Sequence, residues 1–410
     1  GCLPIRYRAL RIAQLRLSPA AMTACLGQRD VRLAPVRLVG VLDTSPIRFS
    51  VAGATYSLKG GHWRVLAPSV RLQNGTDESV LTAALVTGWS TPAGLSGDMT
   101  GLSGSLGAVP LSASQGAGRW RVTQAGLLFD GKMMIADRQA EPRFFPISAD
   151  AIQLQLTGTH MRGEALLREP KSGALLSRLA LQHNLSDGRG GAQLEVEKLS
   201  FNDRLQPEAI SPVTLGVVAN VQGSLRGQGR IDWTPQGVTS SGRFSTDGLD
   251  FAAAFGPVTG LSGDINFTDL LGLVTSPGQQ VRLASVNPGV LVSDGQVRYR
   301  ILPGYKLQVE GGRWPFAGGV LILEPTILDM AQAADRRLTF GVEGLDAGRF
   351  IAAMRFENIT ATGTYDGHLP MIFDAAGGRI EGGRLVARGG GTLSYVGDVS
   401  NGDLGLISRF

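Results

Sequence analysis

The sequence has few of the residues that catalytic and metal sites need. Of its 410 residues, 2 are cysteine and 4 are histidine, and the histidines are isolated from other metal-ligating residues. Cys2 and Cys25 lack the paired spacing of a zinc site. Carboxylates such as Asp264, Asp269 and Asp329 stand singly beside turn residues, so no general acid and base can be paired. These absences predict a protein that is not an enzyme and that uses neither a metal nor a cofactor.

Long apolar segments and charge clusters are also missing. No apolar run approaches the roughly 18 residues that cross a bilayer as a helix. The formal net charge of +5 is spread along the chain, which argues against a nucleic-acid groove and indicates solvated sheet faces.

The two cysteines leave two interpretations open. A disulfide between Cys2 and Cys25 would close one short loop in an oxidising compartment. The alternative is a pair of buried free thiols.

Glycine and short alternating apolar segments are abundant. The chain has 57 glycines without a Gly-X-Y period, and apolar residues alternate with polar ones in segments such as 151–156 and 193–199. Dipeptides that favour tight turns punctuate these segments, and we predict hairpin turns at Asn74-Gly75, Asp130-Gly131, Asp187-Gly188, Asp294-Gly295, Asp366-Gly367 and Asn401-Gly402. The pattern predicts a mainly β protein built from one long antiparallel meander.

Helices are expected in only three places. Residues 77–86, 269–274 and 347–354 allow one to three helical turns each. That is too little helix to cover the apolar face of a long sheet.

A weak repeat of spaced glycines enters several predicted strands. It occurs in residues 93–107, 221–233, 258–267 and 361–373. Glycine inside a strand marks a bend or a close backbone approach, so the repeat would let one sheet curl along its length. Turns of a two-sheet sandwich use the same residues, and periodicity alone does not choose between the two.

Residues 296–312 show the alternation most clearly. Val297, Tyr299 and Ile301 alternate with arginines, and after Pro303-Gly304 Leu307 and Val309 alternate with charged or amide residues. Alternate residues of a strand point to opposite faces, so this segment predicts a hairpin with one apolar and one charged face.

Several segments of the second half resemble the YdbH-type proteins of Gram-negative bacteria. The resemblance rests on residues 256–301 (GPVTGLSGDINFTDLLGLVTSPGQQVRLASVNPGVLVSDGQVRYRI), 309–325 (VEGGRWPFAGGVLILEP) and 358–397. The order PGQ, NPG, GGRWPFAGG and TGTYDGHLP is more specific than any one of these motifs. The resemblance covers about residues 221–397, whereas residues 1–220 are similar only in style.

Such proteins belong to the AsmA-like group, which includes TamB-like members. The resemblance implies a long antiparallel sheet curled into an elongated apolar groove, a β-taco-like trough with few short helices. It further implies an inner-membrane-anchored periplasmic bridge that carries phospholipids to the outer membrane. We expect residues 1–220 to form the N-terminal part of the groove and residues 221–410 its family-like C-terminal part, truncated at the distal end. The anchor is expected upstream of this fragment.

Two further expectations concern ligands and partners. The family has also been labelled dicarboxylate transport, which the sequence disfavours because no compact Arg and Lys cluster is present. By resemblance, a small outer-membrane lipoprotein is the expected partner, joined by strand addition at a sheet edge.

Acyl chains would explain what covers the apolar face. Leaving apolar surface in water costs about 25 cal/mol for each Å². We predict a lipid-groove lining of Val297, Tyr299, Ile301, Leu307, Val309, Trp314, Phe316, Leu321 and Leu323, with Arg298, Arg300, Lys306 and Glu310 on the outer wall. Alternatively these apolar residues pack only against each other, as in a structural or adhesive β-repeat protein of the envelope with a dry core and no lipid ligand.

Overall fold

The computed structural model describes residues 1–12, 14–91, 94–107, 109–124, 126–253, 255–288, 290–329, 336–354, 358–374 and 377–396. These residues form two compact units. Unit 1 comprises Gly1–Thr214, Leu225–Phe244 and Phe267–Gly272, and unit 2 comprises Leu215–Ser224, Ser245–Asn266 and Leu273–Phe410. One antiparallel sheet contains 32 of the assigned strands, which confirms the mainly β prediction.

The first nineteen strands belong to unit 1. They are β1 (Cys2–Tyr7), β2 (Leu10–Ile12), β3 (Leu15–Leu17), β4 (Ala20–Leu26), β5 (Asp30–Leu33), β6 (Val36–Leu42), β7 (Ser45–Val51), β8 (Gly53–Ser57), β9 (His62–Leu66), β10 (Ser69–Asn74), β11 (Asp77–Thr82), β12 (Leu85–Thr91), β13 (Gly94–Ser105), β14 (Leu111–Thr123), β15 (Gly126–Asp137), β16 (Ile147–Thr157), β17 (His160–Arg168), β18 (Leu175–Asn184) and β19 (Gly190–Phe201).

The remaining elements complete both units. They are α1 (Pro207–Ile210), the 3-10 helix η1 (Pro212–Thr214), β20 (Ala219–Thr234), β21 (Gly237–Ala253), β22 (Gly256–Asp269), β23 (Val274–Thr275), β24 (Gln279–Val286), β25 (Val292–Leu302), β26 (Lys306–Phe316), β27 (Gly319–Leu323), β28 (Thr326–Asp329), β29 (Arg336–Asp346), α2 (Ala347–Met354), β30 (Ile359–Ala361), β31 (Thr364–Asp374), β32 (Gly377–Ile380), β33 (Arg384–Ala387) and β34 (Leu393–Tyr395). Strands β30 and β34 form a separate pair.

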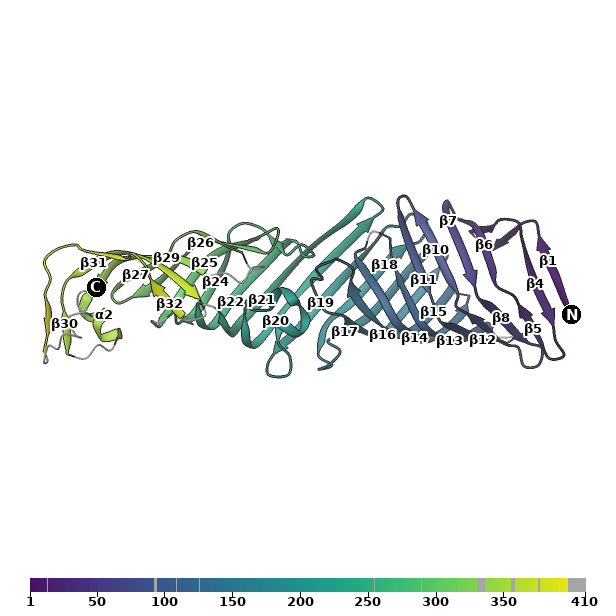
Figure 1. Cartoon of the computed structure of the whole chain (residues 1–410), viewed down its shortest axis with the longest axis horizontal. Coiled ribbons are helices and arrows are strands. Elements are labelled where there is room, and N and C mark those ends of the chain that lie inside the picture. Colours follow the sequence, from purple (N-terminus) through teal and green to yellow (C-terminus); the bar gives the residue numbers. More distant parts are fainter. Residues whose placement is uncertain are drawn as a thin grey trace. The chain divides into compact units, whose positions relative to one another are not determined.

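Unit 1 begins as two rows of short strands that merge into one meander. The first row pairs in the order β1, β4, β5, β8, β9 and β12, and the second in the order β2, β3, β6, β7, β10 and β11. Strand β13 pairs with β12 through its first half and with β11 through its last residues. From β13 to β19 the strands pair in chain order (Figure 1).

A line of backbone irregularities separates the two rows and continues into the long strands. The Ala67 amide donates to the Ala84 carbonyl oxygen at 2.9 Å, and Ala67 and Gly101 have φ values of 45° and 64°. Glycine adopts such a φ without the steric cost that a Cβ imposes. The register shifts on β16 between Asp150 and Gln153, and both Ala149 and Ile152 are buried in one cluster. The breaks therefore shift the alternation so that apolar residues keep to one face.

Unit 2 is also an antiparallel meander in which some long strands pair with two short ones. Strands β22, β24, β25 and β26 pair in order, β26 pairs with both β27 and β28, and β27 pairs with β29. Strand β29 pairs with β31, which pairs with both β32 and β33. Helix α2 follows β29, and its Phe350 ring makes an edge contact with Phe316 at 6.0 Å. The hairpin predicted in residues 296–312 is confirmed as β25 and β26.

Two of the three helix predictions are wrong. The segment 347–354 is helix α2, but residues 77–86 form β11 and the start of β12. Residues 270–273 form a turn before β23. The turn at Asn74-Gly75 sends the following chain back along β10, so Asp77 opens a strand.

Turn dipeptides have two uses in this fold. Asn74-Gly75 and Asp187-Gly188 lie at hairpin turns, as predicted. The pairs at 130–131, 294–295 and 366–367 instead lie inside β15, β25 and β31, so those three hairpin predictions are wrong. Asp294 has a φ of 58°, the conformation that a break within a strand requires as much as a hairpin does. Asn401-Gly402 falls outside the residues that the structure describes.

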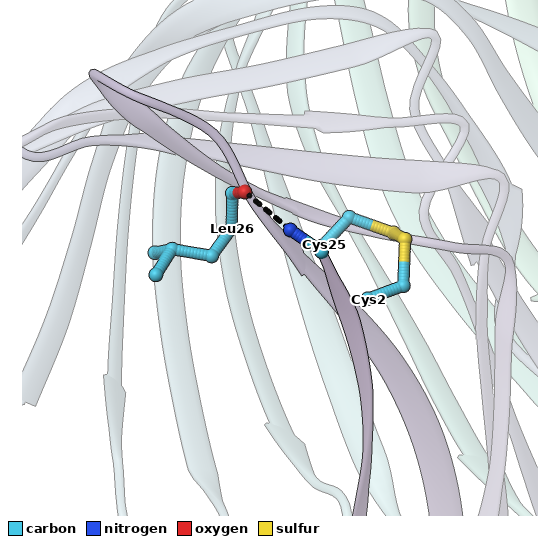
Figure 2. The surroundings of a disulfide bond; sticks show 4 residues. Cys2, Cys25 and Leu26 are labelled. Carbon is cyan, nitrogen blue, oxygen red and sulfur yellow. Dashed lines mark hydrogen bonds between the residues drawn. A yellow bond between two sulfur atoms is a disulfide. The ribbon is translucent and has the colours of Figure 1, made fainter.

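Cys2 and Cys25 form a disulfide between β1 and β4 (Figure 2). The two residues lie directly opposite each other in the register of these strands. The Gly1 amino group donates to the Leu26 carbonyl oxygen at 3.3 Å beside this bond. The free-thiol interpretation is therefore wrong.

Candidate functional site

Unit 1 carries a continuous row of apolar residues and glycines across twelve paired strands. Strand pairing places each member of this row opposite the next, and we call the set the apolar row of unit 1. Its members from β4 to β19 are Leu26, Val31, Tyr56, Trp63, Gly88, Gly97, Trp120, Phe129, Leu154, Gly163, Leu181 and Ala192.

The neighbouring row, made of the residue next to each member of the apolar row, is predominantly polar. Because alternate residues face opposite sides of a sheet, this polar row lies on the other face. Its members are Cys25, Arg32, Thr55, Arg64, Thr87, Asp98, Arg119, Asp130, Gln153, Glu164, Ala180 and Gln193. The sheet of unit 1 therefore has one apolar and one polar face.

Glycines in the apolar row make room for tryptophans. A Cβ atom on Gly88 would lie 2.5 Å from the Trp63 ring and 2.8 Å from the Trp120 ring. The two indoles lie 5.3 Å apart, and Trp120 Nε1 donates to the Thr87 carbonyl oxygen at 3.1 Å. Trp120 is 5% exposed, so this part of the apolar face is covered by its own side chains.

The apolar face becomes accessible toward β1. Leu3 and Leu26 are 67% and 58% exposed, and Tyr56 is 40% exposed. Leu3 lies opposite Ala24, which places it on the same face as Leu26. Leu66 and Trp89 are exposed on the other face, so the candidate contact surface for an apolar ligand is the group of Leu3, Leu26 and Tyr56 on the apolar face.

Unit 2 has the same segregation over seven strands. Its apolar row consists of Gly263, Val281, Val297, Gly312, Leu323, Phe340 and Leu369. The adjacent row consists mainly of polar residues and contains Ser262, Arg282, Gln296, Arg313, Ile322, Gly341 and His368.

The structure brings the nine predicted lining residues onto this apolar face of unit 2. Val309, Trp314, Leu321 and Leu323 are buried in one cluster, and Val297, Leu307 and Phe316 pack against it. Tyr299 lies opposite Val309 and Ile301 lies opposite Leu307, so both share the face. Whether these residues line a lipid groove stays a prediction.

Burial also changes the chemistry of Tyr299. Removal of the phenol from water raises the pKa of Tyr299 to about 12, because the phenolate loses its hydration. The charged residues of the same hairpin lie at alternate positions. Arg298 is exposed, and the Arg300 Nε donates to Gln308 Oε1 at 2.9 Å.

Some buried residues of the apolar faces were not predicted. In unit 2 these include Val258, Leu283, Val292, Phe340 and Phe373, which belong to the same cluster as Trp314. Their strands show alternation, but the breaks shift its phase, so a single period of two does not select them.

A polar hollow lies over β14 to β20 in unit 1. It has a volume of 860 Å³, and its lining includes Arg121, Asp130, Gln153, Arg162, Glu164 and Gln182. Several of these residues belong to the polar row, and the lining also includes Leu154, Gly163, Leu181 and Ala192 of the apolar row. No three His, Cys, Asp or Glu side chains among the residues placed by the structure are grouped to hold a metal ion.

Comparison with known proteins settles the family. The model of the YdbH-like family, described as intermembrane phospholipid transport protein YdbH, matches residues 2–406. The chain belongs to the YdbH-like family. A search among curated proteins and a search among solved structures each found no match.

The YdbH-like match extends the resemblance that the sequence suggested. Residues 1–220 were similar only in style, yet the family match includes them. The family description implies transport of phospholipids between membranes and therefore a location in the cell envelope. Within the part of the chain that is described, none of the helices has the length and apolar character that crossing a membrane takes.

Proposed function

We propose that this chain is a periplasmic, bridge-like carrier that moves phospholipids between the inner and outer membranes along its apolar face. The observation that carries the proposal is the apolar row, which runs unbroken over twelve strands in a YdbH-like protein. Acyl chains need no specific hydrogen bonds, so a surface of apolar side chains and glycines suffices to bind them.

The proposal requires the sheet to curl so that the apolar face becomes a groove. Strand β13 has 12 residues, which corresponds to about 40 Å for a flat strand. The Oγ of Ser45, the first residue of β7 at one end of these strands, nevertheless lies 2.9 Å from the carbonyl oxygen of Ser186, in a turn at the other end. A contact at this distance supports curling within unit 1.

Location and partners form part of the same proposal. The Cys2–Cys25 disulfide supports an oxidising compartment such as the periplasm. Strand β33 pairs with β31 near the last of the described strands, and we propose strand addition by a small outer-membrane lipoprotein at an edge of the sheet. Anchoring in the inner membrane is proposed for the full-length protein.

Lipid extraction from the purified chain, followed by mass spectrometry, tests the proposal. We expect co-purified phospholipid in the unaltered protein and a several-fold loss of it in Tyr56→Asp, which places a charge on the exposed part of the apolar row. Thr55→Asp introduces the same charge on the opposite face of the same strand and is expected to retain the lipid.

A chain that carries no phospholipid when purified from membranes in mild detergent would contradict the proposal. That result would favour the structural or adhesive protein with a dry core, for which the buried cluster around Trp314 provides the best support.

A further inference from the structure

Hairpin turns from opposite ends of the strands meet in unit 1. The Ser45 Oγ lies 2.7 Å from Asn74 Oδ1 and 2.9 Å from the Ser186 carbonyl oxygen, and both atoms are acceptors for its proton. Ser45 is the first residue of β7 and Asn74 is the last residue of β10, and both strands belong to the second row. The last strand of that row, β11, pairs with the last residues of β13. Ser186 lies in the β18–β19 turn, beside the row that contains the first half of β13.

Two more contacts join the same turns. A Cβ atom on Gly75 would lie 3.8 Å from Pro235 Cβ in the β20–β21 turn. A Cβ atom on Gly188 would lie 3.1 Å from Asn74 Cβ. The turns β10–β11, β18–β19 and β20–β21 thus lie side by side.

A buried hydrogen bond joins β20 and β18 next to these turns. Trp233 Nε1 donates to His183 Nδ1 at 3.1 Å, and both side chains are buried. Trp233 belongs to a cluster with Val109 and Ala192, against which Leu181 of the apolar row packs. Ser45, Asn74 and His183 are all buried polar residues, which is unusual for hairpin ends that face water.

We propose that these turns form a clasp that closes the groove of unit 1 and opens when a phospholipid headgroup passes. We define the clasp as Ser45, Asn74, Ser186, His183 and Trp233. The inference rests on the proposed function and adds a control point to it.

The physical reason is the amphipathic character of the cargo. Acyl chains on the apolar face leave the charged headgroup in water between the two rims of the sheet. At the clasp the rims are in hydrogen-bond contact, so no gap is left for a headgroup. Dragging the headgroup through the apolar interior instead would strip its water without replacing it, at a large cost. Opening is the easier route, because the hydrogen bond from Ser45 to the Ser186 carbonyl oxygen is one that water can replace, while Trp233 can stay in its buried cluster.

A disulfide across the clasp tests this inference. The 3.8 Å between Cβ positions suits a disulfide in the double variant Gly75→Cys/Pro235→Cys. A photo-reactive residue at position 181 reports lipid under the clasp, and one at position 56 reports lipid on the exposed part of the apolar row. The probe is a labelled phosphatidylethanolamine supplied in phosphatidylethanolamine and phosphatidylglycerol vesicles.

We expect oxidation to lower the labelling rate at position 181 at least tenfold and to leave the rate at position 56 unchanged. The single variants Gly75→Cys and Pro235→Cys, treated in parallel, are expected to label both positions alike under oxidant and reductant. They also control for the native disulfide.

The opposite perturbation is Asn74→Ala, which removes one of the two acceptors of the Ser45 hydroxyl and the side chain that faces Gly188. It is expected to raise the labelling rate at position 181 several-fold, whereas Arg71→Ala, on the other face of β10, leaves it unchanged. Equal labelling rates at position 181 with the engineered disulfide formed and reduced would overturn the clasp. Absence of labelling at position 56 as well would instead overturn the proposed function on which the clasp depends.

Discussion

Trp120 offers the sharpest test of how the two faces of unit 1 are divided. Its indole is 5% exposed, lies 5.3 Å from Trp63 and donates a hydrogen bond to the Thr87 carbonyl oxygen. Truncation of a buried Trp to Ala costs about 3–5 kcal/mol. About 1 kcal/mol of this corresponds to the lost hydrogen bond. Trp120→Phe keeps most of the apolar volume, so we expect it to cost about 1–2 kcal/mol.

Arg119 is the matched control, because it is the preceding residue of the same strand and belongs to the polar row. Its side chain is exposed, so Arg119→Ala is expected to change the free energy of unfolding by less than about 0.5 kcal/mol. Urea unfolding followed by far-UV circular dichroism measures all three variants. Equal losses for Arg119→Ala and Trp120→Ala would refute the assignment of these residues to opposite faces.

Three further predictions concern packing and titration. Gly88→Ala places a Cβ against two tryptophan rings and is expected to cost about 1–3 kcal/mol in urea unfolding, whereas Gly248→Ala, which meets nothing within 4 Å, is expected to cost less. Burial lowers the pKa of His183 from its ordinary 6.5, so the unfolded chain binds more protons and the free energy of unfolding falls as pH drops below 6.5. Urea unfolding at pH 7.5 and 5.5 is expected to show this loss in the unaltered chain and a smaller one in His183→Gln. The pKa of about 12 for Tyr299 predicts one tyrosine that ionises well above 10 in an ultraviolet titration, absent in Tyr299→Phe, and a free energy of unfolding that falls as pH rises above 10.

Local alternation predicted the hairpins but not the breaks within strands. The segment 296–312 folds as its period of two indicates, with Tyr299 opposite Val309. Asp294-Gly295 has the composition of a hairpin turn yet lies inside β25, because a positive φ serves a break as well as a turn. Which of the two occurs depends on pairing with the neighbouring strand, and that information is not local.

The candidate site was predictable only where motifs were specific. The nine lining residues come from the segment that resembles the family, and they share one face of unit 2. The apolar row of unit 1 was missed, although Trp63 and Trp120 and the glycines between them belong to it. Its register runs through strands far apart in sequence, and glycine carries no hydropathy signal of its own.

The division between an acyl-binding face and a solvated face is tested most directly by photo-cross-linking at neighbouring positions. A photo-reactive residue replaces Tyr56 or Thr55 in unit 1, and Val297 or Arg298 in unit 2, and the chain is irradiated in cells that synthesise labelled phospholipid. The account predicts phospholipid adducts at positions 56 and 297 and few at positions 55 and 298. Equal labelling within each pair, or none at positions 56 and 297, would contradict it.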